Sequence, residues 1–205
     1  RASELLAADF LVTSRDDIPP EWEAQARQAG LRTARTLTFR SVVVADENMR
    51  LTQVKAVTEG YPLRGQLRES DSPFGADRPS TSIPEPGNVW LEGRVLAALG
   101  LAIGETIEIG ASTLRIDRVL TYEPDRGGDL FSVAPRVLMN LADVPATQLV
   151  QPGSRVRHRL LFAAPREMGD DYRASLAEGL PVNYQIHTVR EGRPQLRGAL
   201  DRARQ

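Results

Sequence analysis

Residues 88–120 read NVWLEGRVLAALGLAIGETIEIGASTLRIDRVL and place three kinds of element in quick succession. The run at 89–91 is apolar and short, which predicts a strand. Residues 93–99 carry apolar side chains and are followed by glycine, so they predict a short helix with a glycine stop. Over residues 103–120, apolar and polar side chains alternate on either side of a Gly-Ala-Ser turn at 110–112, which predicts a hairpin. The middle of the chain is therefore β-rich.

Towards the N-terminus, glycines and prolines interrupt any period between residues 58 and 87, and we expect a long ordered loop or crossover there. Earlier still, residues 9–14 form an apolar run that predicts a strand. Pro19 and Pro20 mark the start of a helix that ends at Gly30. Alternation over residues 37–57, with a turn at 46–48, then predicts a hairpin.

Towards the C-terminus, the same reasoning predicts strands at 131–139, 156–162 and 182–189, and a helix at 167–180. Each end of the chain thus contains a strand-helix-strand unit. This arrangement predicts an α+β fold in which both chain ends build a ferredoxin-like βαβ layer. We expect residues 1–57 and 155–205 to form this α+β subdomain, and residues 58–154 to be an inserted β-rich subdomain.

The two termini have helical character. Residues 1–8 resemble the tail of a helix, and Leu196 and Leu200 lie one helical turn apart after Pro194. These helices either continue into neighbouring segments as stalks or are frayed polar termini. No run approaches the roughly 18 apolar residues of a membrane span, and residues 1–8 lack the pattern of a signal peptide.

Composition excludes several kinds of site. The 26 basic and 27 acidic residues give a net charge of −1, so the basic footprint of a nucleic-acid-binding protein is missing. The chain has no cysteine, which removes thiolate catalysis, disulfides and thiolate metal sites. Its two histidines, His158 and His187, have no acidic residue at a ligand-like offset. We therefore expect no metal and no cofactor.

No sequence motif of a nucleophile elbow, a phosphate-binding loop, a zinc protease or an EF-hand is present. The acidic run at 123–129, EPDRGGD, could supply two carboxylates for acid-base chemistry. Its proline, aspartates and glycines are also turn formers, and we interpret it as a flexible, exposed loop that contacts a partner. We expect no catalytic residues.

Five residues are candidates for partner contact. Glu123, Asp125 and Arg126 lie in the acidic loop, and Tyr61 and Arg64 lie in the segment GYPLRG at 60–65, whose glycines and proline permit a tight backbone path.

The segment at 88–110, with a helix that ends in Leu-Gly and a Gly-Glu-Thr hairpin, resembles the extracytoplasmic domains of the MacB and FtsX-like permease family. The segments at 60–65 and 123–156 resemble one branch of this family. The resemblance implies a MacB-like periplasmic core domain of an inner-membrane protein, located between two membrane helices. It also implies that a separate cytoplasmic ABC ATPase supplies the energy through the membrane part of the permease, and that the domain moves in response.

For this branch, the resemblance implies extraction or export of a hydrophobic or lipid-like cargo, and a possible periplasmic esterase as partner. Two alternatives stay open. The chain could be a stand-alone periplasmic binding or scaffold module, or an enzyme with a dispersed site on a barrel suggested by the hairpin at 104–120.

Overall fold

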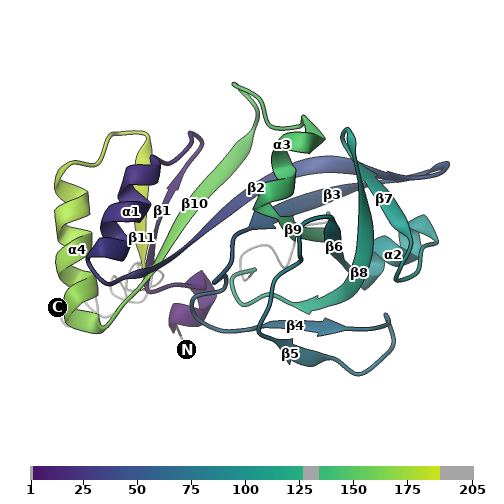
Figure 1. The fold of residues 1–205 in the computed structure, drawn as a ribbon, viewed down its shortest axis with the longest axis horizontal. Coiled ribbons are helices and arrows are strands. Elements are labelled where there is room, and N and C mark those ends of the chain that lie inside the picture. The colour runs from purple at the N-terminus through teal and green to yellow at the C-terminus, as the bar shows by residue number, and fades with distance from the viewer. Residues whose placement is uncertain (1, 127–133, 190–205) are drawn as a thin grey trace, which may run out of the picture.

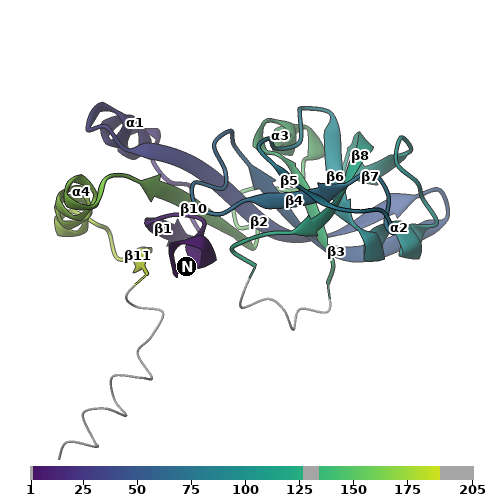
Figure 2. The ribbon, with the colours of Figure 1, turned by 90° about the horizontal axis from the view of Figure 1, so that it is seen from below.

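The computed structural model describes residues 2–126 and 134–189, and within them one continuous eleven-stranded sheet organises the molecule. The strand order is β11-β1-β10-β2-β3-β9-β6-β8-β4-β5, and β7 pairs with both β2 and β8. Figure 1 shows an elongated shape, with α1 and α4 near one end and α2 near the other. The long strand β2 runs from the end with α1 and α4 toward the end with α2 (Figure 1 and Figure 2), so it ties the two parts of the molecule together.

The first part is the ferredoxin-like layer, as predicted. Its strands are β1 (Phe10–Ser14), β2 (Arg32–Ala45), β10 (Val156–Ala163) and β11 (Tyr184–Thr188). They pair antiparallel in the order β11-β1-β10-β2. The crossover helices are α1 (Pro20–Gln28) and α4 (Arg166–Glu178). Each helix connects two strands that flank a third, which is the double βαβ arrangement that the sequence predicted.

The helices α1 and α4 pack on one face of this layer. Phe10 stacks on Phe162 with ring centroids 4.7 Å apart, and Tyr172 of α4 lies against the same ring. Trp22 of α1 contacts Tyr184 of β11 edge to face. Aromatic and aliphatic side chains from both helices therefore cover the sheet, and this burial provides the main driving force for the layer.

The second part is a closed barrel. Following the pairings, β2 pairs with β3 (Asn48–Val57), β3 with β9 (Arg136–Asn140), and β9 with β6 (Asn88–Glu92). The ring continues from β6 to β8 (Ser112–Tyr122), from β8 to β7 (Thr106–Ile109), and back to β2. Six strands thus close on themselves, which leaves no free edge within the ring.

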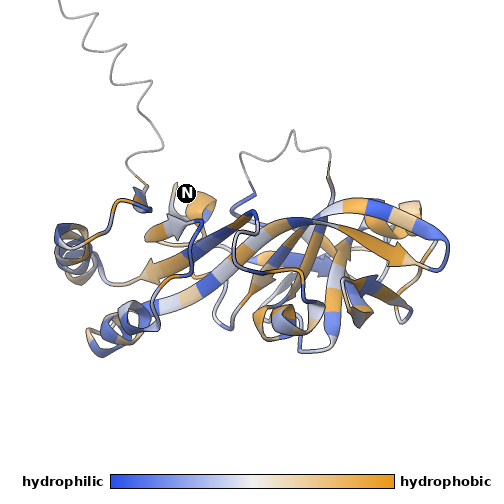
Figure 3. Ribbon diagram, turned by 90° about the horizontal axis from the view of Figure 1, so that it is seen from above, coloured by the Kyte–Doolittle hydropathy of each residue, from blue (hydrophilic) through white to orange (hydrophobic). Residues whose placement is uncertain are grey.

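The barrel interior is filled by apolar side chains that alternate along each strand, such as Val43 and Ala45 on β2 and Ile107 and Ile109 on β7. Figure 3 shows this alternation as hydrophobic and hydrophilic bands along the long strands. Helix α2 (Gly93–Leu99) adds three buried side chains to this core. It ends at Gly100, as predicted, and Gly100 adopts the left-handed conformation. The short η3 (Leu141–Asp143) and α3 (Val144–Thr147) follow β9.

We expected the region 58–87 to be a long loop or crossover. The structure corrects this, because the region also holds two short strands. They are β4 (Leu67–Ser70), which pairs with β8, and β5 (Arg78–Ser80), which pairs with β4. These strands are stabilised by cross-strand ion pairs, such as Arg78–Glu69 at 2.7 Å. They lack the apolar alternation by which a strand is recognised in a sequence.

Other boundaries shifted. The predicted strand at 37–45 begins earlier, at Arg32, and the start of the chain is a 3₁₀ turn, η1 (Ala2–Leu6). Residues 131–133 of the predicted strand at 131–139, and the predicted helix after Pro194, lie outside the described residues. The proposed division at residues 57 and 155 stays a prediction, since β2 belongs to both parts of the sheet.

Candidate functional site

A buried ionic cluster lies beside the barrel, centred on Lys55 of β3. The Lys55 side chain is 2% exposed, and its Nζ lies 2.7 Å from Oδ2 of Asp125 and 3.2 Å from Oε2 of Glu123. The same Nζ donates to the hydroxyl of Tyr61 at 2.8 Å. The Tyr61 hydroxyl in turn donates to Oδ1 of Asp125 at 2.6 Å. One ammonium therefore joins two segments that are distant in sequence, residues 55–61 and 123–125.

Two arginines and a second glutamate extend the cluster. Nε of Arg136 on β9 donates to Oε1 of Glu123 at 2.8 Å, and the Arg136 backbone N–H donates to Oε1 of Glu92 at 2.7 Å. Arg126 forms an ion pair with the same oxygen of Glu92 and lies 3.8 Å from Glu123. The cluster thus balances three cations, Lys55, Arg126 and Arg136, against three carboxylates, Glu92, Glu123 and Asp125.

Burial and charge act in opposite directions on these groups. Burial raises the pKa of Asp125, but the charge and hydrogen bond of Lys55 and the hydrogen bond from Tyr61 outweigh it, and the net pKa is lowered. Burial raises the pKa of Tyr61, and the charges of Asp125 and Glu123 raise it further. At neutral pH Asp125 is therefore ionised and Tyr61 keeps its proton, which is the pairing that the hydrogen bonds require.

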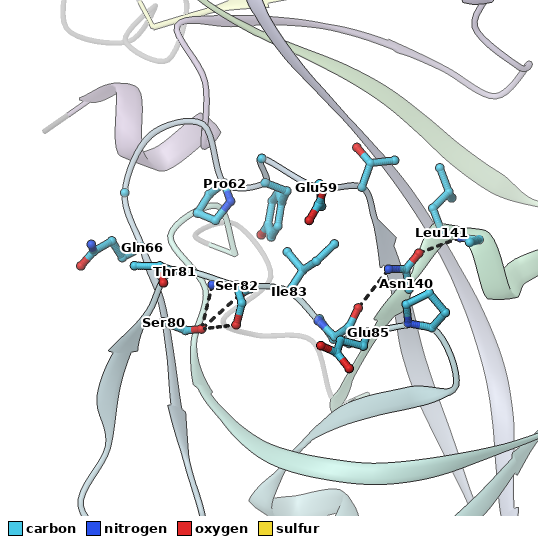
Figure 4. Close-up of a pocket in the computed structure, with 17 residues that line it drawn as sticks. Glu59, Pro62, Gln66, Ser80, Thr81, Ser82, Ile83, Glu85, Asn140 and Leu141 are labelled. Carbon is cyan, nitrogen blue, oxygen red and sulfur yellow. Dashed lines mark hydrogen bonds between the residues drawn. The ribbon is translucent and has the colours of Figure 1, made fainter.

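Tyr61 connects this cluster to an open groove of about 970 Å³. The groove walls come from three segments, 58–66, 80–86 and 140–142, which Figure 4 shows facing a common space. The apolar wall residues are Tyr61, Pro62, Ile83, Pro84, Pro86, Leu141 and Ala142. Among the described residues that line the groove, Glu59 and Glu85 are the only ionisable groups besides Tyr61. The groove is therefore mostly neutral, with a small acidic component.

Several polar groups in the groove hold its shape. The Ser80 hydroxyl donates to the backbone oxygen of Ser82 at 3.1 Å and accepts from the Ser82 backbone N–H. Nδ2 of Asn140 donates to the backbone oxygen of Pro84 at 3.0 Å. These bonds fix the walls, while Pro62, Pro86, Leu141 and Ala142 present partly or fully exposed apolar side chains, so the groove suits an uncharged or amphipathic ligand.

The structure brings together three of the five candidate residues, Tyr61, Glu123 and Asp125, and places Arg126 at the edge of the same cluster. Arg64 lies apart, where its Nε and Nη2 form a bidentate pair with Asp9 at 2.9 Å. The expectation of an exposed acidic loop is wrong for Glu123 and Asp125, whose side chains are buried against Lys55. Asp129 lies outside the described residues. Contact with a partner stays a prediction for all five residues.

Sequence reasoning missed Lys55, Arg136 and Glu92. Lys55 is the only lysine of the chain and lies in a strand whose neighbours Val54, Ala56 and Val57 are apolar and buried. A lysine in such a run needs an acidic partner elsewhere, and this signal was available in the sequence.

Over residues 2–126 and 134–189, no three His, Cys, Asp or Glu side chains are grouped so that they could hold a metal ion. In the same ranges, no helix has both the length and the apolar character needed to cross a bilayer.

Comparison with known proteins gives consistent results. No protein-family model matches the chain. The chain is 34% identical, over all 205 residues, to the protein described as the uncharacterized ABC transporter permease YbbP of Escherichia coli strain K12. It spans 24% of the length of that relative.

Solved structures share the fold at low identity. The periplasmic region of MacB from Actinobacillus actinomycetemcomitans matches with a TM-score of 0.57 and 9% identity, covering 96% of this chain and 95% of that one. The extracellular domain of the ABC-type transporter YknZ from Gram-positive bacteria matches with a TM-score of 0.56 and 9% identity, covering 87% of this chain and 100% of that one. A domain of a putative permease from Porphyromonas gingivalis matches with a TM-score of 0.51 and 9% identity, covering 88% of this chain and 90% of that one.

The ferredoxin-like layer joined to a β-barrel is thus the fold of these extracytoplasmic domains. With the sequence match over all 205 residues to part of a permease, it follows that the chain is homologous to a domain of an ABC transporter permease and has the fold of the MacB-like periplasmic domains.

Proposed function

We propose that this domain transmits ATP-driven movement of its parent permease to the groove beside Tyr61, and so helps to extract or export lipid-like hydrophobic molecules. A separate cytoplasmic ABC ATPase hydrolyses ATP, and the membrane part of the permease passes the movement to the domain. The domain itself carries out no bond-breaking step.

The observation that carries this proposal is the register of β1 and β11. Phe10 at the start of β1 lies opposite Thr188 at the end of β11, so the chain enters and leaves the sheet at one point. From there the hydrogen-bonded sheet continues without a break through β10, β2 and β3 into the barrel. A force applied at Phe10 and Thr188 is therefore passed to the barrel by strand pairing, as in a rigid lever.

The character of the groove favours a hydrophobic or lipid-like cargo. Its apolar walls, its volume of about 970 Å³ and its scarcity of charge match the general character of sites for apolar ligands. Thr58 and Gln66, at the two ends of one wall segment, add uncharged polar groups for an ester or alcohol.

We further propose that a periplasmic esterase receives the cargo and hydrolyses it. Arg126 and the rim of the groove are the surface that we assign to this contact, and the buried wall residue Tyr61 supports that rim from below. Glu123 and Asp125 act through Arg126 and Tyr61, which they hold in place.

The test reconstitutes the full permease and its ATPase in liposomes and follows ATP-dependent release of a fluorescent diacylglycerol to acceptor vesicles. Ala142→Trp places a large side chain into the groove from an exposed lining position. Ala98→Trp, on an exposed position of α2 outside the groove, is the matched control. We expect Ala142→Trp to reduce release and Ala98→Trp to leave it unchanged.

Equal release by both variants would contradict the assignment of the groove as the cargo path. Release that does not depend on ATP in the unmodified permease would contradict the transport function itself, and would favour a binding or scaffold module.

A further inference from the structure

A second cavity, of about 550 Å³, lies where the chain enters and leaves the sheet. Asp9 and Phe10 at the start of β1, and Thr188 and Val189 at the end of β11, line one side of it. Arg64 from the segment after β3, and Arg166 and Arg173 from α4, line the remainder. Three guanidinium groups from two distant parts of the sequence thus face one space.

These guanidinium groups have donors to spare. Arg64 uses Nε and Nη2 for Asp9, which leaves Nη1. Nη2 of Arg173 lies 3.7 Å from Oδ1 of Asp170, which is beyond hydrogen-bonding distance. Arg166 has no hydrogen-bond or ion-pair partner within the described part of the chain. A guanidinium offers five N–H donors in a planar fork, so most of the donors in this cavity are unused.

Two carboxylates, Asp9 and Asp170, oppose the arginines and offset only part of their positive charge. Asp9 is already engaged within the chain, because it accepts both bonds from Arg64 and a third from the backbone N–H of Ala164 at 3.0 Å. The side chain of Asp170 is 56% exposed and therefore well solvated. Three cations against two anions leave the cavity with an excess of one positive charge.

We propose that this cavity binds a phosphate group. Arginine recognises phosphate oxygens with paired, charge-assisted hydrogen bonds, and a single bound phosphodiester would match the excess charge. The phosphate belongs to a lipid headgroup or is free in solution. The headgroup source rests on the proposed function, since that function places Phe10 and Thr188 next to the membrane.

The test needs neither transport nor a membrane, so its outcome is separate from that of the proposed function. The 205-residue chain, labelled with ¹⁵N, is titrated with inorganic phosphate, with soluble short-chain phosphatidylglycerol and with short-chain phosphatidylcholine. The reporters are the backbone amides of Phe10, Gly169 and Thr188, which line the cavity. The variants are Arg166→Gln and Arg173→Gln, and the control is Arg115→Gln, which removes an exposed arginine on β8, outside the cavity.

We expect saturable shifts at the three reporters, and a loss of affinity of at least about tenfold in each variant but not in the control, as for one lost charge-assisted hydrogen bond. Tighter binding of phosphatidylglycerol than of phosphate identifies a headgroup site, and binding of inorganic phosphate alone identifies a free-phosphate site. Absence of saturable shifts with all three probes would overturn the proposal. An equal loss in Arg115→Gln would overturn it as well, because binding would then reflect only net charge.

Discussion

Replacing Lys55 with methionine tests the role of the buried cluster most sharply. Methionine keeps the length and apolar stem of lysine but removes the ammonium that contacts Asp125, Glu123 and Tyr61. The cluster then holds three carboxylates against two arginines, and the Lys55 site is 2% exposed, so water cannot compensate.

The size of the effect follows from this geometry. Removing one partner of a buried ion pair costs about 3–5 kcal/mol, because the other charge is left buried and uncompensated. A domain of this length loses about 2–4 °C in melting temperature per kcal/mol. Lys55→Met should therefore lower the melting temperature by about 6–20 °C. Adding Asp125→Asn restores equal numbers of charges, and the double variant should recover part of this loss.

The assay is thermal unfolding at pH 7 followed by circular dichroism, with urea unfolding to obtain the free energy. Arg115→Met is the control, since the Arg115 side chain is 54% exposed and its ion pair with Asp117 spans 3.5 Å. Such a pair contributes about 1 kcal/mol or less. If Lys55→Met melted within the range of Arg115→Met, or if adding Asp125→Asn destabilised it further, the ammonium of Lys55 would not stabilise the fold by compensating buried carboxylates.

Three further results are expected. Gly110 has φ +54°, and a Cβ there would collide with the backbone oxygen of Thr147, so Gly110→Ala should lower the free energy of unfolding in urea by several kcal/mol. Gly100 has φ +64° but open space around it, so Gly100→Ala should cost only about 1–2 kcal/mol. Equal costs would argue against the close approach at Gly110. Burial lowers the pKa of His158 despite the nearby Asp17, so the contribution of His158 to stability is complete above about pH 6.5 and is lost as the pH falls below that value. His158→Gln should therefore flatten the decline of melting temperature from pH 7 to pH 5. An unchanged slope would refute this. Tyr61→Phe removes a hydroxyl that both donates and accepts within the cluster, and should cost about 1–3 kcal/mol by chemical denaturation, with a cost near zero as the contrary result.

The ferredoxin-like layer was predictable because its elements carry local signals. The double proline before α1, the apolar run at β1 and the apolar stripe of α4 each depend on neighbouring residues. The barrel was harder to predict, since its closure depends on β7 reaching β2 through the pairs Val43–Ile109 and Val44–Glu108, which no local pattern encodes. The sequence predicted the hairpin of β7 and β8, but not the pairing of β7 with β2 that closes the barrel.

The candidate site was predictable only in part, for a physical reason. The acidic loop has the composition of a surface turn, and its burial depends on Lys55 and Arg136, which lie on β3 and β9. Strands β4 and β5 escaped detection because ion pairs replace apolar alternation along them. In both cases long-range charge pairing decided the structure, and charge pairing leaves no periodic trace in the sequence.

The central claim is that the domain moves as one body and carries the groove with it. Because this chain has no cysteine, spin labels can be placed at Ser82→Cys in the groove and Gln185→Cys on β11 without competing sites in the domain. In the full permease with its ATPase, pulsed electron paramagnetic resonance then measures the distance between these labels, and the distance from Ser82→Cys to labelled lipid headgroups, with and without ATP. We predict a constant distance within the domain and an ATP-dependent distance to the membrane. A change within the domain together with a fixed distance to the membrane would contradict the account.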